Sequence, residues 1–209
     1  MSGIISRYNK KYIVVILFVM TGLSLFGQYE EKSRALKLTL GGGYGYYFNT
    51  FTNVLDEDVK NSRPSFSAKL MWQPEYRLRI GVESGYYEIY STTRIETISK
   101  TQKLTTNLNV IPLFITLSMK TSKHFDINFA TGGAIMNYGV IVNKSKKSRI
   151  EGSTLSLSNF AAGFTWYLPL GERFEFGSEF KYLYLGKTRD SHVSAFLNFS
   201  YKIVNRKIK

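Results

Sequence analysis

The 209-residue sequence predicts an all-β fold, an eight-stranded antiparallel up-and-down β-barrel that spans a membrane. Three observations support this fold class. Seven of eight strand-like segments alternate apolar with small or polar residues at the period of a β-strand, and the eighth, 104–119, is apolar on both parities. Long and short connections alternate between these segments, as they do at the two ends of an outer-membrane barrel. The interior of so narrow a barrel holds only side chains, so the apolar face must contact lipid.

The amino terminus is predicted to be an export signal. The basic residues Arg7, Lys10 and Lys11 precede an uncharged apolar run over residues 12–26, which is the layout of a secretory signal peptide. That run is shorter than the roughly 20 residues of a spanning helix, which favours a cleavable signal over a membrane anchor. We expect a signal peptide at 1–27, a short periplasmic leader at 28–35, the barrel at 36–203 and a basic periplasmic tail at 204–209.

The first three strands are predicted at residues 36–48, 66–72 and 78–85. In the first strand the even positions are mostly apolar and the odd positions are small or polar, and the other two strands show the same split. The glycine-rich run 41–45 lacks the Lys-Ser/Thr pair of a phosphate loop. We interpret it as small residues that relieve crowding inside the barrel or allow a bend.

Five more strands are predicted at residues 104–119, 125–130, 159–168, 174–184 and 193–203. The first of these is apolar on both parities, so its register stays open. Pro112 predicts a bulge there, because proline cannot donate to a strand ladder. The other four strands each have one apolar face, which is mostly aromatic in 125–130, 159–168 and 174–184.

Aromatic residues toward the strand ends on the apolar face are predicted to form interfacial girdles, because their amphipathic rings suit the headgroup level. These residues are Tyr44, Tyr46, Trp72, Tyr86, Tyr90, Trp166, Tyr182, Tyr184 and Tyr201. The alternative is a tyrosine-rich core of a soluble protein.

The connections support a membrane barrel independently of the strands. Those at 49–62, 91–103 and 143–153 are long and polar, those at 73–76, 120–124 and 169–173 are short, and 187–190 is also short. Long external loops and short periplasmic turns alternate in this way in outer-membrane barrels. A soluble sandwich has no reason to do so.

One resemblance rests on two short motifs. The segment 108–115, Leu-Asn-Val-Ile-Pro-Leu-Phe-Ile, followed by Phe-Ala-Thr-Gly-Gly at 129–133, resembles the small PorT-like outer-membrane β-barrel family. Ala162-Gly163, Leu170-Gly171 and Phe180-Lys181-Tyr182 are similar to that family's later strands. The resemblance covers roughly the whole mature chain and implies an eight-stranded barrel in a Gram-negative envelope. Many members have no assigned activity, and some resemble parts of a secretion apparatus.

Composition excludes several kinds of site. The chain has no Cys, which excludes disulfide frameworks, thiolate zinc sites, Fe–S clusters and cysteine nucleophiles. Its two histidines are far apart in the sequence, so neither a metal site nor another cofactor is predicted. The net charge of +13 falls to +10 when the three basic residues of the signal leave, and export makes nucleic acid an unexpected partner for this charge.

Charged residues on the polar parity predict an ion-pair network inside the barrel. Desolvated charges in a narrow lumen need partners, and the six positive and four negative side chains on this face nearly balance. The predicted network comprises Lys69, Arg79, Glu83, Glu175, Glu179 and Lys181, with Lys37, Arg77, Asp126 and Lys202 on the same face. A proton or ion path is the alternative interpretation.

His192 and Ser194 are the candidate catalytic residues, since they lie two apart on one strand face beside Asp190. A His can act as base for a Ser nucleophile when an acid orients it. The pair resembles the His-x-Ser of barrel lipid A deacylases. However, Ala195 stands where those enzymes have Asn, and no carboxylate side chain follows Asp190. A structural role is preferred.

A cluster of cations, Lys144, Lys146, Lys147 and Arg149, lies in a predicted external loop. The nearest anions on the outer face of such a membrane are lipopolysaccharide phosphates, which clustered Lys and Arg bind electrostatically. We predict lipopolysaccharide binding here, with a solvated loop as the alternative.

These patterns predict a non-enzymatic outer-membrane protein with a structural or docking role, acting through its external loops or its periplasmic face. Its expected partners are outer-membrane lipid, lipopolysaccharide and an envelope protein. Three alternatives stay open: a component of a protein secretion apparatus, a lipid A-modifying hydrolase using His192 and Ser194, and a soluble periplasmic barrel that binds a small apolar ligand.

Overall fold

The computed structural model describes residues 33–48, 58–74, 77–96, 102–143 and 147–207. The expected signal peptide at 1–27 lies outside these residues. Within the described ranges, no helix is long and apolar enough to cross a membrane.

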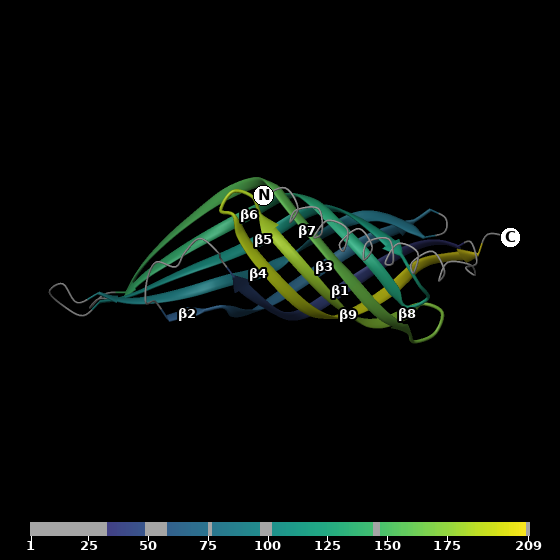
Figure 1. Ribbon diagram of the computed structural model, residues 1–209, viewed down its shortest axis with the longest axis horizontal. Helices are drawn as coiled ribbons and strands as arrows, with labels where there is room; N and C mark the ends of the chain where they lie inside the picture. The colour runs from purple at the N-terminus through teal and green to yellow at the C-terminus, as the bar shows by residue number, and fades with distance from the viewer. Residues whose placement is uncertain (1–32, 49–57, 75–76, 97–101, 144–146, 208–209) are drawn as a thin grey trace, which may run out of the picture.

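Eight strands form a closed antiparallel barrel, which confirms the predicted fold class (Figure 1). The described residues contain nine strands: β1 (Ser33–Phe48), β2 (Asp58–Lys60), β3 (Ser62–Gln73), β4 (Leu78–Glu96), β5 (Gln102–Lys120), β6 (Phe125–Asn143), β7 (Lys147–Pro169), β8 (Phe174–Leu185) and β9 (Asp190–Lys207). Their order is β2-β4-β3-β1-β9-β8-β7-β6-β5, and pairing of β4 with β5 closes the ring. The short strand β2 pairs with β4 and is not part of the ring.

Burial confirms the predicted alternation of inward and outward residues. In β3, Ser67 and Lys69 are buried, while Phe66, on the other parity, is exposed. In β5, whose register was open, Phe114 faces the interior and Leu113 faces outward. Successive side chains of a strand point to opposite faces of the sheet, so the face on which one residue lies gives the faces of its neighbours.

The bulge predicted at Pro112 is wrong. β5 keeps a single register with β6 through the pair Pro112–Ala134. On its other side, the β4–β5 ladder skips the pairs opposite Ile111 and Pro112 without a change of register. Proline lacks the N–H that a ladder hydrogen bond needs, so the ladder is interrupted here but not shifted.

A bulge occurs instead on β4, between Glu88 and Tyr90. The extra residue turns Tyr90 toward the interior, where its ring centroid lies 4.8 Å from that of Tyr47. Tyr90 therefore does not belong to the outer aromatic girdle in which it was predicted.

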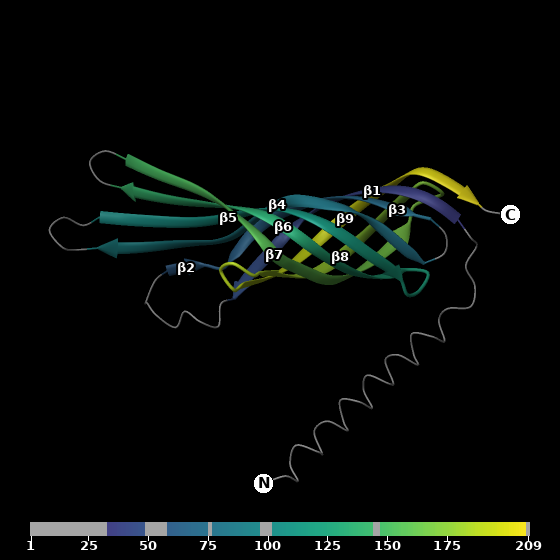
Figure 2. The same ribbon diagram turned by 90° about the horizontal axis from the view of Figure 1, so that it is seen from above.

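Two hairpins project beyond one end of the ring (Figure 2). β4 pairs with β5 as far as Glu96–Gln102, and β6 pairs with β7 as far as Asn143–Lys147. Most of the predicted loops 91–103 and 143–153 are therefore strand. We call this end the hairpin end.

The opposite end carries the short turns after β3, β5 and β7, and we call it the turn end. Backbone hydrogen bonds close the turns after β5 and β7, from Thr121 N to Phe125 O at 2.9 Å and from Leu170 N to Phe174 O at 2.8 Å. The pairing of β1 with β9 starts here at Ser33–Lys207. Residues 204–207, which were expected in the tail, are thus part of the barrel ladder.

The glycines of β1 make room inside the barrel, as predicted. A Cβ on Gly45 would collide with the His192 ring, and one on Gly43 would collide with the backbone at Ala195. Side chains on this face of β1 would therefore displace the residues that β9 places in the lumen.

Candidate functional site

The outer surface of the ring is an apolar belt. Ile115 is 61% exposed and Leu197 is 63% exposed, although side chains of this kind are usually buried in soluble proteins. Outward rings also stack on one another, as do Phe164 and Phe180 with centroids 5.4 Å apart. A continuous belt of this kind is far larger than the apolar patches of soluble monomers and is typical of a lipid-facing barrel wall.

Aromatic rings cluster toward both ends of the belt. Toward the hairpin end, ring contacts join Tyr46 to Phe48, Phe48 to Tyr182, and Phe160 to both Tyr182 and Tyr184. Toward the turn end, Phe174 contacts Phe199 and Tyr201, with centroids 5.6 and 5.0 Å apart. This arrangement is that of two interfacial girdles.

The belt ends at a row of polar residues, Asn109, Asn137 and Ser153, on three neighbouring strands. Asn109 pairs with Asn137, and Asn137 pairs with Ser153. Ser153 Oγ donates a hydrogen bond of 2.8 Å to Asn137 Oδ1. The residues two positions nearer the turn end on the same strands are Ile111, Ile135 and Leu155. The outward face therefore changes from apolar to polar within two residues on each strand.

Beyond this row, β4 to β7 continue as an open four-stranded sheet, which we call the raised sheet. It comprises residues 91–96, 102–109, 137–143 and 147–153 (Figure 2). Its strands extend about 20–25 Å past the polar row, at about 3.3 Å per residue. Residues 104–109 of this sheet were predicted as strand, but 91–103 and 143–153 were predicted as loops. Polar Asn107, Asn109 and Asn137 continue the outward parity of the lipid-facing strands and signal where the belt ends.

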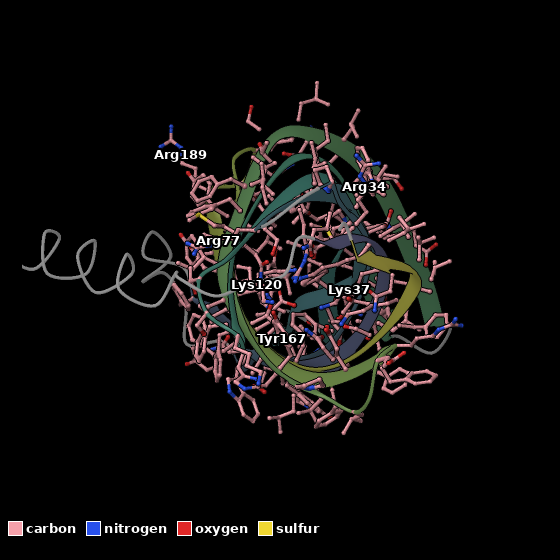
Figure 3. All side chains as sticks on the ribbon, turned by 90° about the vertical axis from the view of Figure 1, so that its right-hand side faces the viewer. Arg34, Lys37, Arg77, Lys120, Tyr167 and Arg189 are labelled. Carbon is pink, nitrogen blue, oxygen red and sulfur yellow. The ribbon has the colours of Figure 1, made fainter. Side chains whose placement is uncertain are left out.

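The lumen near the turn end holds the charged residues. Seen from this end, Lys37 and Tyr167 point into the barrel, whereas Arg77 lies at its outer margin (Figure 3). Arg77 belongs to the turn before β4, so its expected place in the lumen is wrong. The six residues named in the predicted network are all buried inside.

Four of those residues form a square that ties opposite walls of the barrel together. Lys69 on β3 pairs with Glu179 on β8, and Lys181 on β8 pairs with Glu83 on β4. The second contact of each lysine is longer, at 3.9 Å from Lys69 to Glu83 and 3.4 Å from Lys181 to Glu179. Each carboxylate thus lies between two ammonium groups, the arrangement that a desolvated charge requires.

Neutral donors complete the coordination of the two carboxylates. Asn198 Nδ2 donates to Glu179 Oε2 at 3.0 Å. Tyr87 Oη and Thr116 Oγ1 each donate to Glu83 at 3.3 Å. A buried network is stable only when its members are satisfied, and these bonds supply the missing partners.

A second group of ion pairs lies closer to the turn end. Lys37 Nζ contacts Glu175 at 2.5 Å, and Lys202 contacts the other oxygen of the same carboxylate at 2.8 Å. Arg79 pairs with Asp126 and also donates to Gln73 at 2.9 Å. Fixed pairs of this kind hold charges in place, which does not suit a path for mobile ions.

Apolar side chains fill the lumen toward the hairpin end. This apolar plug contains Tyr87, Ile89, Leu108, Val110, Phe114, Met136, Leu183, Leu185 and Phe196. Tyr87 and Phe196 meet edge to face, with ring centroids 5.9 Å apart. In the charged half, a cavity of about 30 Å³ remains between Lys37, Arg79 and Asn198, which is room for about one water. The lumen is therefore packed and is not an open pore.

The catalytic candidates lie within this packed interior. Ser194 Oγ lies 3.2 Å from His192 Nδ1, so the structure brings the two side chains together. Both are fully buried, and the His192 ring meets Tyr87 edge to face at 6.0 Å. Asp190 accepts a hydrogen bond from Tyr47 at 2.9 Å. A lipid substrate outside the barrel wall does not reach this pair.

Replacing Ser194 with alanine is expected to leave the lipid A of the host membrane unchanged, because the hydroxyl group does not face lipid. Mass spectrometry of lipid A from cells that overproduce the natural chain or Ser194→Ala measures this directly. A modification that appears with the natural chain and disappears with Ser194→Ala would restore the hydrolase alternative.

The remaining predicted site stays a prediction. Lys144 and Lys146 lie outside the described residues, and the side chains of Lys147 and Arg149 in β7 are not described. Within the described part of the chain, no cluster of His, Cys, Asp or Glu is suited to hold a metal ion.

No protein-family model and no curated protein matches the chain. Ail, the attachment invasion locus protein of Yersinia pestis, in complex with the heparin analogue sucrose octasulfate, covers 83% of this chain and 100% of its own, with 10% identity and a TM-score of 0.46. OprG from Pseudomonas aeruginosa covers 81% and 97%, with 9% identity and a TM-score of 0.42. Neisserial surface protein A covers 80% and 97%, with 13% identity and a TM-score of 0.37. Likenesses at this level concern the fold alone, and the resemblance to PorT-like barrels stays a prediction.

Proposed function

We propose that this chain is an outer-membrane protein with a docking role, in which a sealed barrel holds the raised sheet outside the membrane. The single observation that carries this proposal is the polar row. At Asn109, Asn137 and Ser153 the lipid-facing surface ends, while the strands that carry it continue without interruption. A membrane anchor alone needs no strand beyond that row.

The dimensions of the belt support insertion in a bilayer. Its stretch on β5, residues 111–119, is as long as the roughly 9–11 residues with which a tilted strand crosses an outer membrane. Closure of the ring pairs most backbone groups of the spanning segments. On the β8 side, the pairing of β7 begins at Ser158, and Lys187 donates to the carbonyl of Leu155 just beyond it.

The orientation follows from the two unlike ends. In outer-membrane barrels the short turns face the periplasm and the longer connections face outward. The turns after β3, β5 and β7 lie at the end where β1 begins and β9 finishes, so the raised sheet is on the outer side. Its function there is passive: the barrel supplies a rigid base, and the sheet supplies a surface at a fixed distance from lipid.

The packed lumen leads to a test of this function. Purified protein reconstituted in planar bilayers is expected to give no discrete conductance steps, because the apolar plug and the ion-pair network fill the interior. Discrete steps of constant size would show an open path and contradict the docking role in favour of transport.

The proposed orientation is tested on intact cells. Trypsin added from outside is expected to cut near Lys103 and Lys147 in the raised sheet and to leave Lys123, in a turn at the other end, intact. Cleavage of permeabilised cells at Lys123 provides the control. Cutting at Lys123 but not in the raised sheet of intact cells would reverse the orientation.

A further inference from the structure

We propose that the free edge of β7 in the raised sheet binds an extended, acidic segment of a partner protein as an added β-strand. This inference rests on the docking role proposed above and specifies its mode. It is carried by the pairing pattern of the sheet, by the direction of the backbone groups along β7 and by the charge of this strand.

The ring closes all of its own edges, but the raised sheet does not. β8 pairs with β7 from Asn159 onward, and the last backbone bond between these walls runs from Gly186 N to Ser158 O at 2.9 Å. Among the described residues, β7 pairs with β6 alone over 147–157, and residues 147–153 of this stretch form the free edge of the raised sheet. This edge is longer than a typical strand of about 5–6 residues.

The two edges of the raised sheet differ. At the β4 edge, the short strand β2 covers the sheet through the pairs Asp58–Thr93, Val59–Thr92 and Lys60–Ser91. Natural proteins cover or blunt their strand edges, because an open edge is a template for another chain. The β7 edge has no Pro over residues 147–157 and no covering strand among the described residues. An edge left open beside a covered one is a site for strand addition.

One contact shows which backbone groups face the open side. Lys187 Nζ donates to the carbonyl of Leu155 at 3.4 Å from the side of β8, so the peptide groups of Leu155 point away from β6. Backbone groups along an antiparallel strand alternate in direction from residue to residue. The N–H and C=O groups of Ser153 and Glu151 therefore also point to the open side, whereas those of Thr154 bond to β6.

An exposed apolar side chain lies on this edge. Ile150 in the raised part of β7 is 63% exposed. Cross-strand neighbours on an added strand would remove part of this area from water, which adds affinity to the backbone hydrogen bonds.

Charge identifies the occupant as acidic. The raised part of β7 carries two cations in its sequence, Lys147 and Arg149, against the single carboxylate of Glu151. Two copies in one membrane run their β7 strands in the same direction, so self-pairing would bring these cations together at a cost. An acidic segment of another protein gains from the same cations.

The test uses a fluorescent ten-residue peptide that alternates Glu or Asp with Val or Thr, and the full chain in a neutral detergent. Fluorescence anisotropy is expected to show saturable binding. A peptide of the same sequence, N-methylated on alternate residues along its pairing edge, is expected to bind at least about tenfold more weakly, because it loses several backbone hydrogen bonds. A peptide with Lys in place of the acidic residues is also expected to bind more weakly.

Variants of Ser153 locate the site on the protein. Ser153→Pro removes an outward N–H and leaves the β6 side of the strand intact, so it is expected to weaken binding about tenfold or more. Ser153→Ala keeps the backbone donor and is the matched control, with affinity unchanged. Retained heat-modifiable mobility on gels shows that Ser153→Pro still folds. The N-methylated peptide tests backbone pairing without any variant of the protein.

Three outcomes would overturn the proposal. Equal affinity for the N-methylated peptide would show that strand pairing is not involved. Displacement of the peptide by lipopolysaccharide, together with indifference to N-methylation, would assign the site to anion binding by the basic cluster. A disulfide-linked homodimer of Ser153→Cys, formed in the cysteine-free chain within its own membrane, would assign the edge to a second copy. None of these results changes the conductance or protease tests, so failure here is distinct from failure of the docking role.

Discussion

Replacing Glu179 with alanine is expected to lower the free energy of unfolding by about 3–5 kcal/mol. Glu179 has no exposed side-chain area, and its carboxylate contacts Lys69 and Lys181 and accepts a hydrogen bond from Asn198. Its removal leaves two ammonium groups sharing the single carboxylate of Glu83. An uncompensated buried charge costs more than the pair itself contributes, so the loss is large.

Urea unfolding of the refolded protein in lipid vesicles, followed by the fluorescence of its two Trp residues, measures this change. Glu179→Gln preserves shape and removes only the charge, so it is expected to show most of the loss. Glu172→Ala, at an exposed carboxylate in the turn before β8, is the control and is expected to change stability by less than about 0.5 kcal/mol. A Glu179→Ala protein as stable as this control would mean that the four-residue square does not hold the walls together.

The second large effect is expected from Val82→Arg, which places a charge in the middle of the belt. Val82 faces outward on β4 between Ile80 and Ser84, and it is exposed on the barrel surface. In a water-soluble barrel an arginine here is harmless. At the midplane of a bilayer it costs about 2–4 kcal/mol.

The matched control for Val82→Arg is Ser153→Arg, on the same outward surface but at the polar row. There the expected cost is about 0–1 kcal/mol, since the side chain reaches water or headgroups. Both variants are compared by refolding into vesicles and urea titration. Equal stabilities would remove the distinction between lipid-facing and raised residues on which the proposed function depends.

Much of the fold was predictable because lipid on one side and a packed lumen on the other impose a strict alternation on each spanning strand. Phe66 and Lys69 could be assigned to opposite faces from parity alone, and the structure places them so. The residues of the charged network could be named for the same reason. Which lysine meets which carboxylate depends on how far the strands are staggered around the ring, and a sequence does not give that stagger.

The errors also have physical causes. Parity fails after a bulge, so Tyr90 was assigned outward although it packs inward beside Tyr47. Alternation vanishes where no lipid faces the strand, so residues 91–103 and 143–153 were predicted as loops, although most of them are strand in the raised sheet. The apolar plug was missed because an inward Leu183 and an outward Leu197 are the same residue type and differ only in which parity they follow.

The most direct test of the central claim locates the membrane boundary on β5. Because the chain has no Cys, single cysteines at Ile115, Leu113, Asn109 and Asn107 carry spin labels without other changes. In reconstituted vesicles, labels at Ile115 and Leu113 are expected to be accessible to oxygen and shielded from a water-soluble nickel complex. Labels at Asn109 and Asn107 are expected to show the reverse. Access of the nickel complex to all four positions would contradict a lipid-spanning barrel with a raised sheet.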